Sequence, residues 1–174
     1  MRFNIAQLLK DHTGETRQYT LHEEIEGLDP DIVPLSALDG MIHLIRTTDG
    51  VFVTGKLHCS LELACARCLE PFALPLRFTL EEEFHSTLDI LTGVFLPRTE
   101  EFEPATQIDE HHEIDLSEVI RQNILLALPL HAICRSQCAG LCPQCGKNWN
   151  DGACDCKRDA IDPRFEKLKA LLDK

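Results

Sequence analysis

Cysteines gather near the carboxyl end of this 174-residue chain. Six of the nine cysteines lie between residues 134 and 156: Cys134, Cys138, Cys142, Cys145, Cys154 and Cys156. Few large apolar side chains separate them, so burial alone cannot order this segment, and a covalent or metal crosslink is needed. The tight turn from Cys142 to Gly146 brings two thiolates within reach of one tetrahedral ion, and glycine can adopt the positive φ that closes the turn. The segment is therefore predicted to bind zinc.

A tetrahedral zinc site takes four ligands, and six carboxyl-terminal thiols compete for these places. The Cys142/Cys145 turn can be completed either by the Cys134/Cys138 pair before it or by the Cys-x-Cys pair after it. We therefore expect about one structural zinc per chain, with two thiols left over. Disulfides are one alternative, disfavoured because the amino-terminal residues do not resemble a secretory leader. A reactive redox thiol is another.

A second Cys-x-x-Cys pair, Cys65 and Cys68, lies in the middle of the chain. One such pair supplies only half of a tetrahedral site, and cysteine is also a common buried residue. The pair is consistent with a packed turn, a metal half-site or a redox dithiol. Cys59, six residues upstream of Cys65, is either a further ligand or a core thiol. The sequence leaves these alternatives open.

Charge divides the chain into two parts. Residues 1–133 carry 9 Lys/Arg against 23 Asp/Glu, a net charge of −14, whereas residues 134–174 carry 8 against 6, a net charge of +2. An acidic body repels polyphosphate at long range, which disfavours a free nucleic-acid-binding protein of the usual basic type. The predicted partner is a basic protein, or an RNA already coated by one. Because no apolar run approaches the roughly 20 residues of a membrane span, we expect a soluble cytoplasmic or organellar protein without a membrane partner.

The hydrophobic pattern predicts an α+β fold: an antiparallel β-meander or partly open, barrel-like domain over residues 1–133, with packing helices. A small zinc module with a terminal helix is predicted to follow over residues 134–174. Alternating apolar residues predict strands at residues 17–25, 41–45, 51–63 and 73–84. Asp49-Gly50 between two of these runs predicts a type I′ hairpin. Helices are predicted at residues 3–10, from Asp115 to just before Pro129, and from Asp162 onward.

Several longer motifs occur in a fixed order along the chain. They are Cys65-Ala-Arg-Cys-Leu-Glu-Pro-Phe72, Leu125-Leu-Ala-Leu-Pro129, Gly140-Leu-Cys-Pro-Gln-Cys-Gly-Lys-Asn148 with Asn150, and Asp162-Pro-Arg164. In these motifs the chain resembles the YceD-like proteins of bacteria and plastids, named for large-subunit ribosomal RNA accumulation. Trp149 is a departure, since similar sequences carry leucine there. Some similar proteins lack the carboxyl-terminal cysteines, which implies that the metal is a structural aid and that the common function lies elsewhere.

The resemblance implies a non-catalytic factor in the accumulation or processing of large-subunit ribosomal RNA during ribosome assembly. The implied partners are a ribosomal protein or a large-subunit precursor particle, with contact to the RNA itself. No phosphate-cradling glycine loop, nucleophile elbow or His-Glu-x-x-His helix occurs in the sequence, so no enzyme is expected. Two alternatives stay open: a metal-dependent nuclease acting on precursor ribosomal RNA, and a thiol-based redox or chaperone protein.

Overall fold

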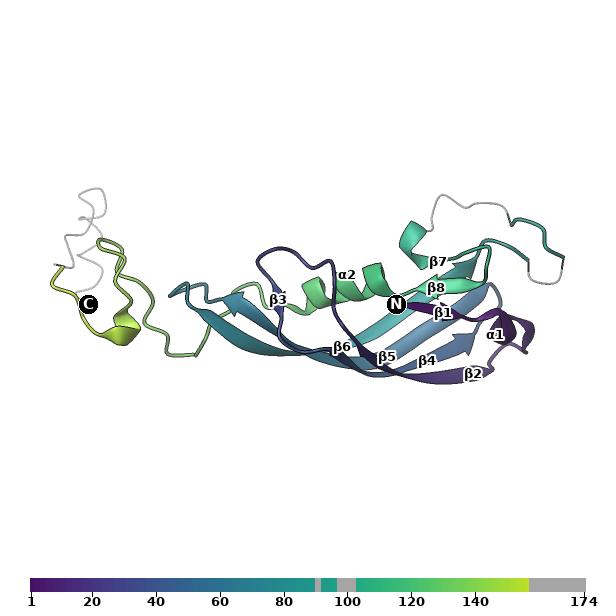
Figure 1. Cartoon of the computed structure of the whole chain (residues 1–174), viewed down its shortest axis with the longest axis horizontal. Helices are drawn as coiled ribbons and strands as arrows, with labels where there is room; N and C mark the ends of the chain where they lie inside the picture. Colours follow the sequence, from purple (N-terminus) through teal and green to yellow (C-terminus); the bar gives the residue numbers. More distant parts are fainter. Residues whose placement is uncertain (90–91, 97–102, 157–174) are drawn as a thin grey trace, which may run out of the picture.

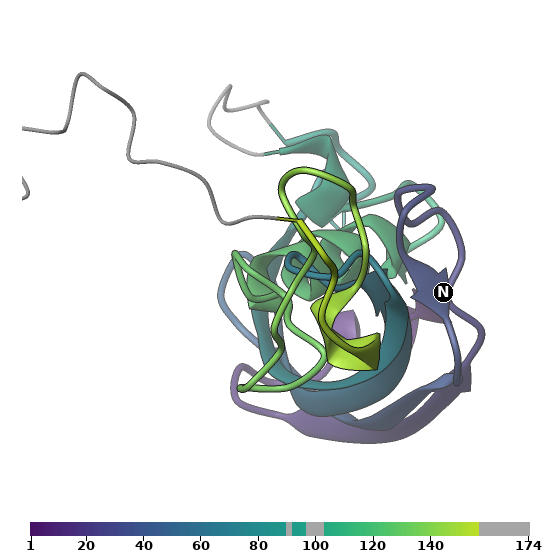
Figure 2. The ribbon, with the colours of Figure 1, turned by 90° about the vertical axis from the view of Figure 1, so that its left-hand side faces the viewer.

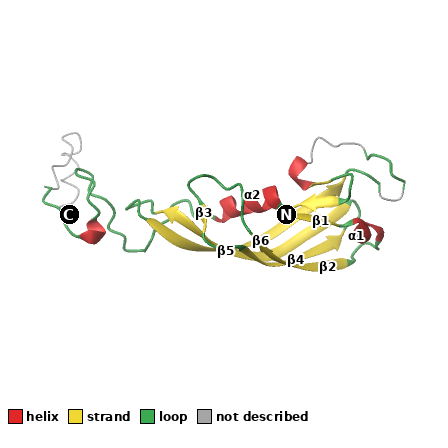
Figure 3. Ribbon diagram, in the orientation of Figure 1, coloured by secondary structure: helices red, strands yellow, loops and turns green. Residues whose placement is uncertain are grey.

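A curved, mainly antiparallel sheet forms the body of the molecule (Figures 1 and 3). The computed structural model describes residues 1–89, 92–96 and 103–156. The main sheet contains β2 (Thr16–Glu23), β3 (Val33–Pro34), β4 (Leu38–Arg46), β5 (Gly50–Ala64), β6 (Pro71–Ser86) and β7 (Gln107–Ile108). A separate pair is formed by β1 (Arg2–Asn4) and β8 (Glu113–Asp115). The helices are α1 (Ala6–Lys10) and α2 (Ser117–Ala127), with 3-10 turns η1 (Pro104–Thr106) and η2 (Trp149–Asp151).

The strand order confirms the predicted meander. Strands β2, β4, β5 and β6 pair antiparallel in succession, β7 joins β6 in parallel, and β3 pairs with β5. Figure 2 shows this sheet curving around α2. Within the described residues β2 and β7 do not pair with each other, so the sheet is open and is not a closed barrel.

The hydrophobic core lies between the inner face of the sheet and the two helices. Alternate residues of β5, from Val51 through Leu57 to Leu61, are buried, as the period of two in a strand requires. On α2, Val119, Ile120 and Ile124 are buried at helical spacing and pack on the sheet, which confirms the predicted amphipathic helix.

Two predicted helix boundaries differ from the structure, because strand pairing takes the flanking residues. Residues 3–10 were predicted as one helix, but Phe3 pairs with Ile114 in the β1–β8 ladder and the helix begins only at Ala6. The second helix begins at Ser117 rather than Asp115. Asp115 ends β8, and its carboxylate accepts a hydrogen bond from the Ser117 N–H at 3.0 Å.

The long β5–β6 hairpin carries a turn well away from the rest of the sheet. Its strands pair continuously from Gly50 opposite His85 to Ala64 opposite Pro71. Residues 65–70 therefore form the tip of a hairpin that extends beyond the other strands (Figure 1). After α2 the chain runs back along the molecule to this tip, which places residues 134–138 beside it.

The β4–β5 hairpin is confirmed, but its predicted type I′ turn is wrong. A type I′ turn needs positive φ at both central residues, and neither Asp49 nor Gly50 has one. The turn is closed instead at its ends, where the Thr47 N–H donates to the Gly50 carbonyl at 3.1 Å and the Gly50 N–H donates to Thr47 Oγ1 at 3.1 Å. Gly50 is required for space, because a Cβ there would lie 1.8 Å from the Phe84 carbonyl oxygen.

Two further expectations concern membranes and the chain end. In the part of the chain that the structure describes, neither helix has the length and apolar character needed to cross a bilayer. The helix predicted from Asp162 onward lies outside the described residues.

Candidate metal centres

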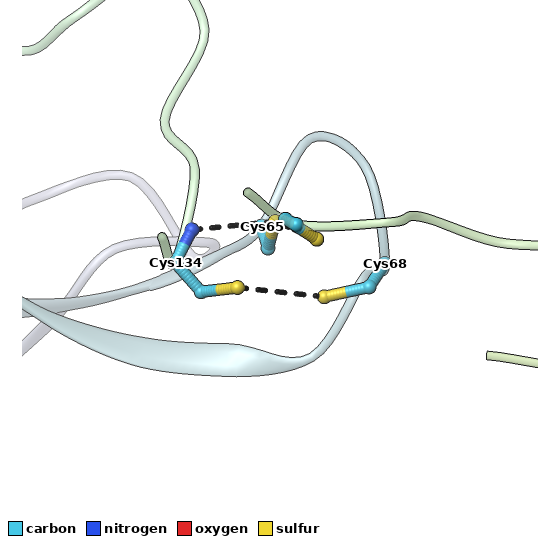
Figure 4. A group of neighbouring side chains, drawn as sticks. Cys65, Cys68 and Cys134 are labelled. Carbon is cyan, nitrogen blue, oxygen red and sulfur yellow. Dashed lines mark hydrogen bonds between the residues drawn. The ribbon is translucent and has the colours of Figure 1, made fainter. Parts of the chain in front are cut away.

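The first candidate centre joins the tip of the β5–β6 hairpin to the segment after α2. Cys65 and Cys68 come from the tip, and Cys134 and Cys138 come from the returning segment. Their four sulfur atoms lie within 4.8 Å of one another. The Cys65–Cys138 and Cys68–Cys134 sulfur pairs are each 3.8 Å apart. Figure 4 shows the Cys68 and Cys134 side chains pointing toward each other across the gap between the two segments.

These sulfur distances fit a tetrahedral metal site and not a disulfide. Four thiolates about 2.3 Å from a central zinc occupy the corners of a tetrahedron whose edges are about 3.8 Å. A disulfide requires a sulfur–sulfur distance of about 2.05 Å, and all nine cysteines are free thiols. The group could therefore hold a metal ion, and four sulfur ligands are a set that zinc or iron prefers.

Hydrogen bonds to the Cys65 sulfur favour the thiolate form of this residue. The backbone N–H of Cys134 and that of Arg67 both donate to Cys65 Sγ at 3.4 Å. The bond from Cys134 above all, then the backbone N–H of Cys68 and that of Arg67, lower the pKa of Cys65 to about 6. Burial and the neighbouring thiols raise the pKa of Cys134 to about 12. A metal ion offsets such differences, because it binds the thiolate form of every ligand.

The second candidate centre lies entirely within the carboxyl-terminal segment. Its sulfur atoms, from Cys142, Cys145, Cys154 and Cys156, also lie within 4.8 Å of one another. The Trp149 ring N–H donates to Cys154 Sγ at 3.4 Å, and this bond is the main cause that lowers the pKa of Cys154 to about 6. Cys145 is exposed, so this centre is less enclosed than the first.

Both centres are built on the same backbone turn. The N–H four residues after the first cysteine donates to that cysteine's carbonyl, at 2.9 Å from Leu69 to Cys65 and at 2.9 Å from Gly146 to Cys142. The first cysteine's own N–H donates to the carbonyl five residues on, at 2.9 Å to Glu70 and 2.8 Å to Lys147. The residue after the second cysteine is left-handed in each turn, with φ of 73° at Gly146 and 60° at Leu69.

The structure divides the six predicted ligands between two centres. The sequence predicted a single four-thiol site, with two of the six thiols left over. The structure instead brings the leftover pair, Cys134 and Cys138, to Cys65 and Cys68, because the long hairpin carries its tip to that segment. The sequence left the role of Cys65 and Cys68 open and did not predict that they complete a four-thiol site with Cys134 and Cys138. Cys59 is a core thiol, and burial raises its pKa.

Asn150 connects the two centres. In the sequence Asn150 lies between Cys145 and Cys154, which are ligands of the second centre. Its side-chain NH₂ nevertheless donates to Cys138 Sγ of the first centre at 3.4 Å. Its side-chain oxygen accepts from the Ala139 N–H at 3.0 Å and from the Arg135 guanidinium at 2.6 Å. The hydrogen bond from Asn150 is the main cause that lowers the pKa of Cys138. One amide side chain thus holds the second centre against the first.

Asn150→Ala is expected to loosen the contact between the centres without removing either ligand set. The variant leaves the Ala139 N–H without its partner and removes one hydrogen bond to the Cys138 sulfur, which typically costs about 1–3 kcal/mol. Hydrogen exchange should rise in residues 138–152 and stay unchanged in β5 and β6. Asp151→Ala, which truncates the exposed neighbouring side chain, is the matched control. Equal exchange in both variants would show that Asn150 does not connect the centres.

Comparison with known proteins places both centres in a shared sequence region. Residues 53–172 match the family model described as large ribosomal RNA subunit accumulation protein YceD. An uncharacterized protein of Mycobacterium tuberculosis is 36% identical over 135 residues, 78% of this chain and 62% of that protein. The Bacillus subtilis protein YlbN is 31% identical over 113 residues, 63% of this chain and 59% of that protein.

A plant relative carries the same description as the family. The chloroplastic YCED homolog 1 of Arabidopsis thaliana, named a large ribosomal RNA subunit accumulation protein, is 41% identical over 64 residues, 37% of this chain and 20% of that protein. The present chain spans 62% of the length of its mycobacterial relatives. No solved structure matches it. Because the family model covers more than half of the chain, this protein belongs to the YceD family of large ribosomal RNA subunit accumulation proteins.

Proposed function

We propose that this protein is a non-catalytic factor that supports the accumulation of large-subunit ribosomal RNA during ribosome assembly. The observation that carries the proposal is the family match over residues 53–172, which includes all eight cysteines of the two centres. The description of the chloroplastic relatives as accumulation proteins points in the same direction. The proposed cellular partner is the precursor of the large subunit.

In this proposal each cysteine group binds one structural zinc ion. A site with four protein ligands has no open position for water or substrate, and such closed sites are structural rather than catalytic. Among the described residues, these two groups are the only ones in which three or more His, Cys, Asp or Glu side chains lie close enough to share an ion. This arrangement favours an assembly role over the metal-dependent nuclease.

The acidic body, residues 1–133, is proposed to meet a basic ribosomal protein, and the cysteine module, residues 134–174, to contact RNA or protein. A groove of about 1140 Å³ supports the first part. It lies between α2 and the segment after β2, and its lining includes Glu23, Glu24 and Glu26. Acidic side chains that line an open groove attract a lysine- or arginine-rich segment and speed its encounter.

Deleting the gene that encodes this chain is expected to lower the ratio of large- to small-subunit ribosomal RNA, and a plasmid copy should restore it. Electrophoresis of total RNA measures this ratio directly. A plasmid copy in which Cys65 and Cys145 are both replaced by serine tests whether the centres are needed. An unchanged ratio in the deletion strain would refute the proposed function.

A second experiment separates the assembly factor from the nuclease. Purified protein incubated with labelled precursor ribosomal RNA and Mg²⁺ is expected to leave the RNA intact. Cleavage that is lost when Glu81 and Glu83 are changed to glutamine would favour the nuclease instead. These two carboxylates lie on the same exposed face of β6.

A further inference from the structure

Two cations on the outer face of the sheet are left without partners, although the body is strongly acidic. Most arginines of the body are engaged, since Arg2, Arg17 and Arg121 form ion pairs with carboxylates, and Arg46 and Arg67 donate to backbone carbonyls. Within the described residues, Lys56 of β5 and Arg77 of β6 make neither a hydrogen bond nor an ion pair. Both are exposed.

These two cations lie near each other on neighbouring strands. His58 is directly opposite Arg77 in the β5–β6 ladder, and Lys56 is directly opposite Thr79, so Lys56 and Arg77 are diagonal neighbours on one face. That face points away from the core, because the intervening Leu57 is buried. A shallow depression of about 380 Å³ is lined by Lys56, Leu57, His58, Arg77, Phe78 and Thr79. We call Lys56, His58, Arg77 and Thr79 the outer-face patch.

Acidic side chains bound this patch on two sides and keep it small. On one side Asp39, opposite His58 in β4, has its carboxylate hydrogen-bonded to His22 at 2.5 Å, and this bond raises the pKa of His22. On the other side the next outward residues of β6 are Glu81 and Glu83. The cationic surface therefore has room for one or two anionic groups and is bounded by negative charge.

We propose that the outer-face patch binds the phosphate backbone of RNA. The proposal rests on the ribosomal RNA role above and assigns part of the RNA contact to the β-sheet. Exposed, unpaired Lys and Arg side chains beside a hydroxyl are groups that contact phosphate, and such contacts position a protein without reading base sequence. An acidic protein is a weaker fit, because a specific protein interface usually needs a larger area with an apolar centre.

The patch also explains how an acidic protein can contact RNA. The groove that carries Glu23, Glu24 and Glu26 is lined by α2, which covers the inner face of the sheet, whereas the patch lies on the outer face. A basic protein can therefore occupy the groove while the patch contacts a phosphate of the same particle. The net charge of −12 repels RNA at long range, so the patch makes a local contact with one or two phosphates that also binds free RNA, though weakly.

The test measures binding of the purified full chain to a fluorescent fragment of large-subunit ribosomal RNA by anisotropy, from about 50 to about 200 mM salt. Lys56→Glu and Arg77→Glu are each expected to weaken binding about five-fold or more at the lower salt. The control is Lys10→Glu, which makes the same charge change at another exposed lysine without an ion pair, on α1. It should weaken binding less than about two-fold.

The double variant Lys56→Glu/Arg77→Glu should flatten the salt dependence. Each lost contact to a single-stranded phosphate reduces the magnitude of the negative slope of log K against log salt by about 0.7. In the double variant the magnitude should therefore fall by about 1.4. The double variant Lys56→Gln/Arg77→Gln removes both positive charges without adding negative ones and should show the same flattening. Its melting temperature should show that it remains folded.

Three results would overturn the proposal. The first is that Lys10→Glu weakens RNA binding as much as the patch variants do. The second is that the native chain does not bind the RNA at the lower salt. The third is that poly-glutamate displaces the RNA at equal charge concentration, which would assign the patch to an acidic protein. The ribosomal RNA ratio in the deletion strain is a separate readout. If that ratio is normal while the patch variants still lose RNA affinity, the cellular role fails and the phosphate contact stands.

Discussion

Cys65→Ser is expected to lower the zinc content from two ions per chain to one and to release the cysteine module from the sheet. Cys65 is buried at the centre that joins the β5–β6 tip to Cys134 and Cys138. Removing one of four thiolates forfeits much of a zinc binding free energy on the order of 10 kcal/mol. Elemental analysis gives the zinc content, and hydrogen exchange should rise throughout residues 134–156.

Cys145→Ser is the matched variant at the other centre. It should also lower the zinc content to one ion, but increased exchange should be limited to residues 142–156, with Cys134 and Cys138 still ordered against the hairpin tip. Cys59→Ser, which alters a core thiol outside both centres, should retain two zinc ions. One zinc in the native chain, or identical exchange in the two ligand variants, would contradict the two-centre arrangement.

Gly50→Ala is expected to lower the free energy of unfolding of the body by about 3 kcal/mol or more. The added Cβ would lie 1.8 Å from the Phe84 carbonyl oxygen and 2.8 Å from the Phe84 carbonyl carbon. These are backbone atoms of the paired strand, so no side-chain rotation relieves the contact, and β5 and β6 must separate where the hairpin begins. Urea unfolding followed by circular dichroism measures the change.

Thr48→Ala is the control for this effect. Thr48 is exposed in the same turn, and its truncation should change the free energy of unfolding by less than about 0.5 kcal/mol. If Gly50→Ala were as stable as Thr48→Ala, the close approach of β5 to β6 at Phe84 would be wrong.

Local sequence patterns were sufficient for most of the sheet and for one metal turn. Alternating apolar residues located β4, β5 and β6, and helical spacing identified the buried face of α2, because both periods follow directly from backbone geometry. Gly146 marked the Cys142/Cys145 turn, since glycine adopts positive φ at little cost. Leu69 adopts the same conformation in the Cys65/Cys68 turn but carries no such signal.

Contacts between distant segments were decided only by the tertiary structure. Cys65 meets Cys138 across 73 residues, because a long hairpin and the return of the chain after α2 bring them together. The same pairing of strands places Lys56 near Arg77 and Gly50 against Phe84. The spacing of two cysteines along the chain determines only whether they can share one turn. Which second pair completes the site depends on how far the β5–β6 hairpin extends and on where the chain runs after α2. That choice is a property of the whole fold, because it is fixed by packing over many residues and not by the residues that meet.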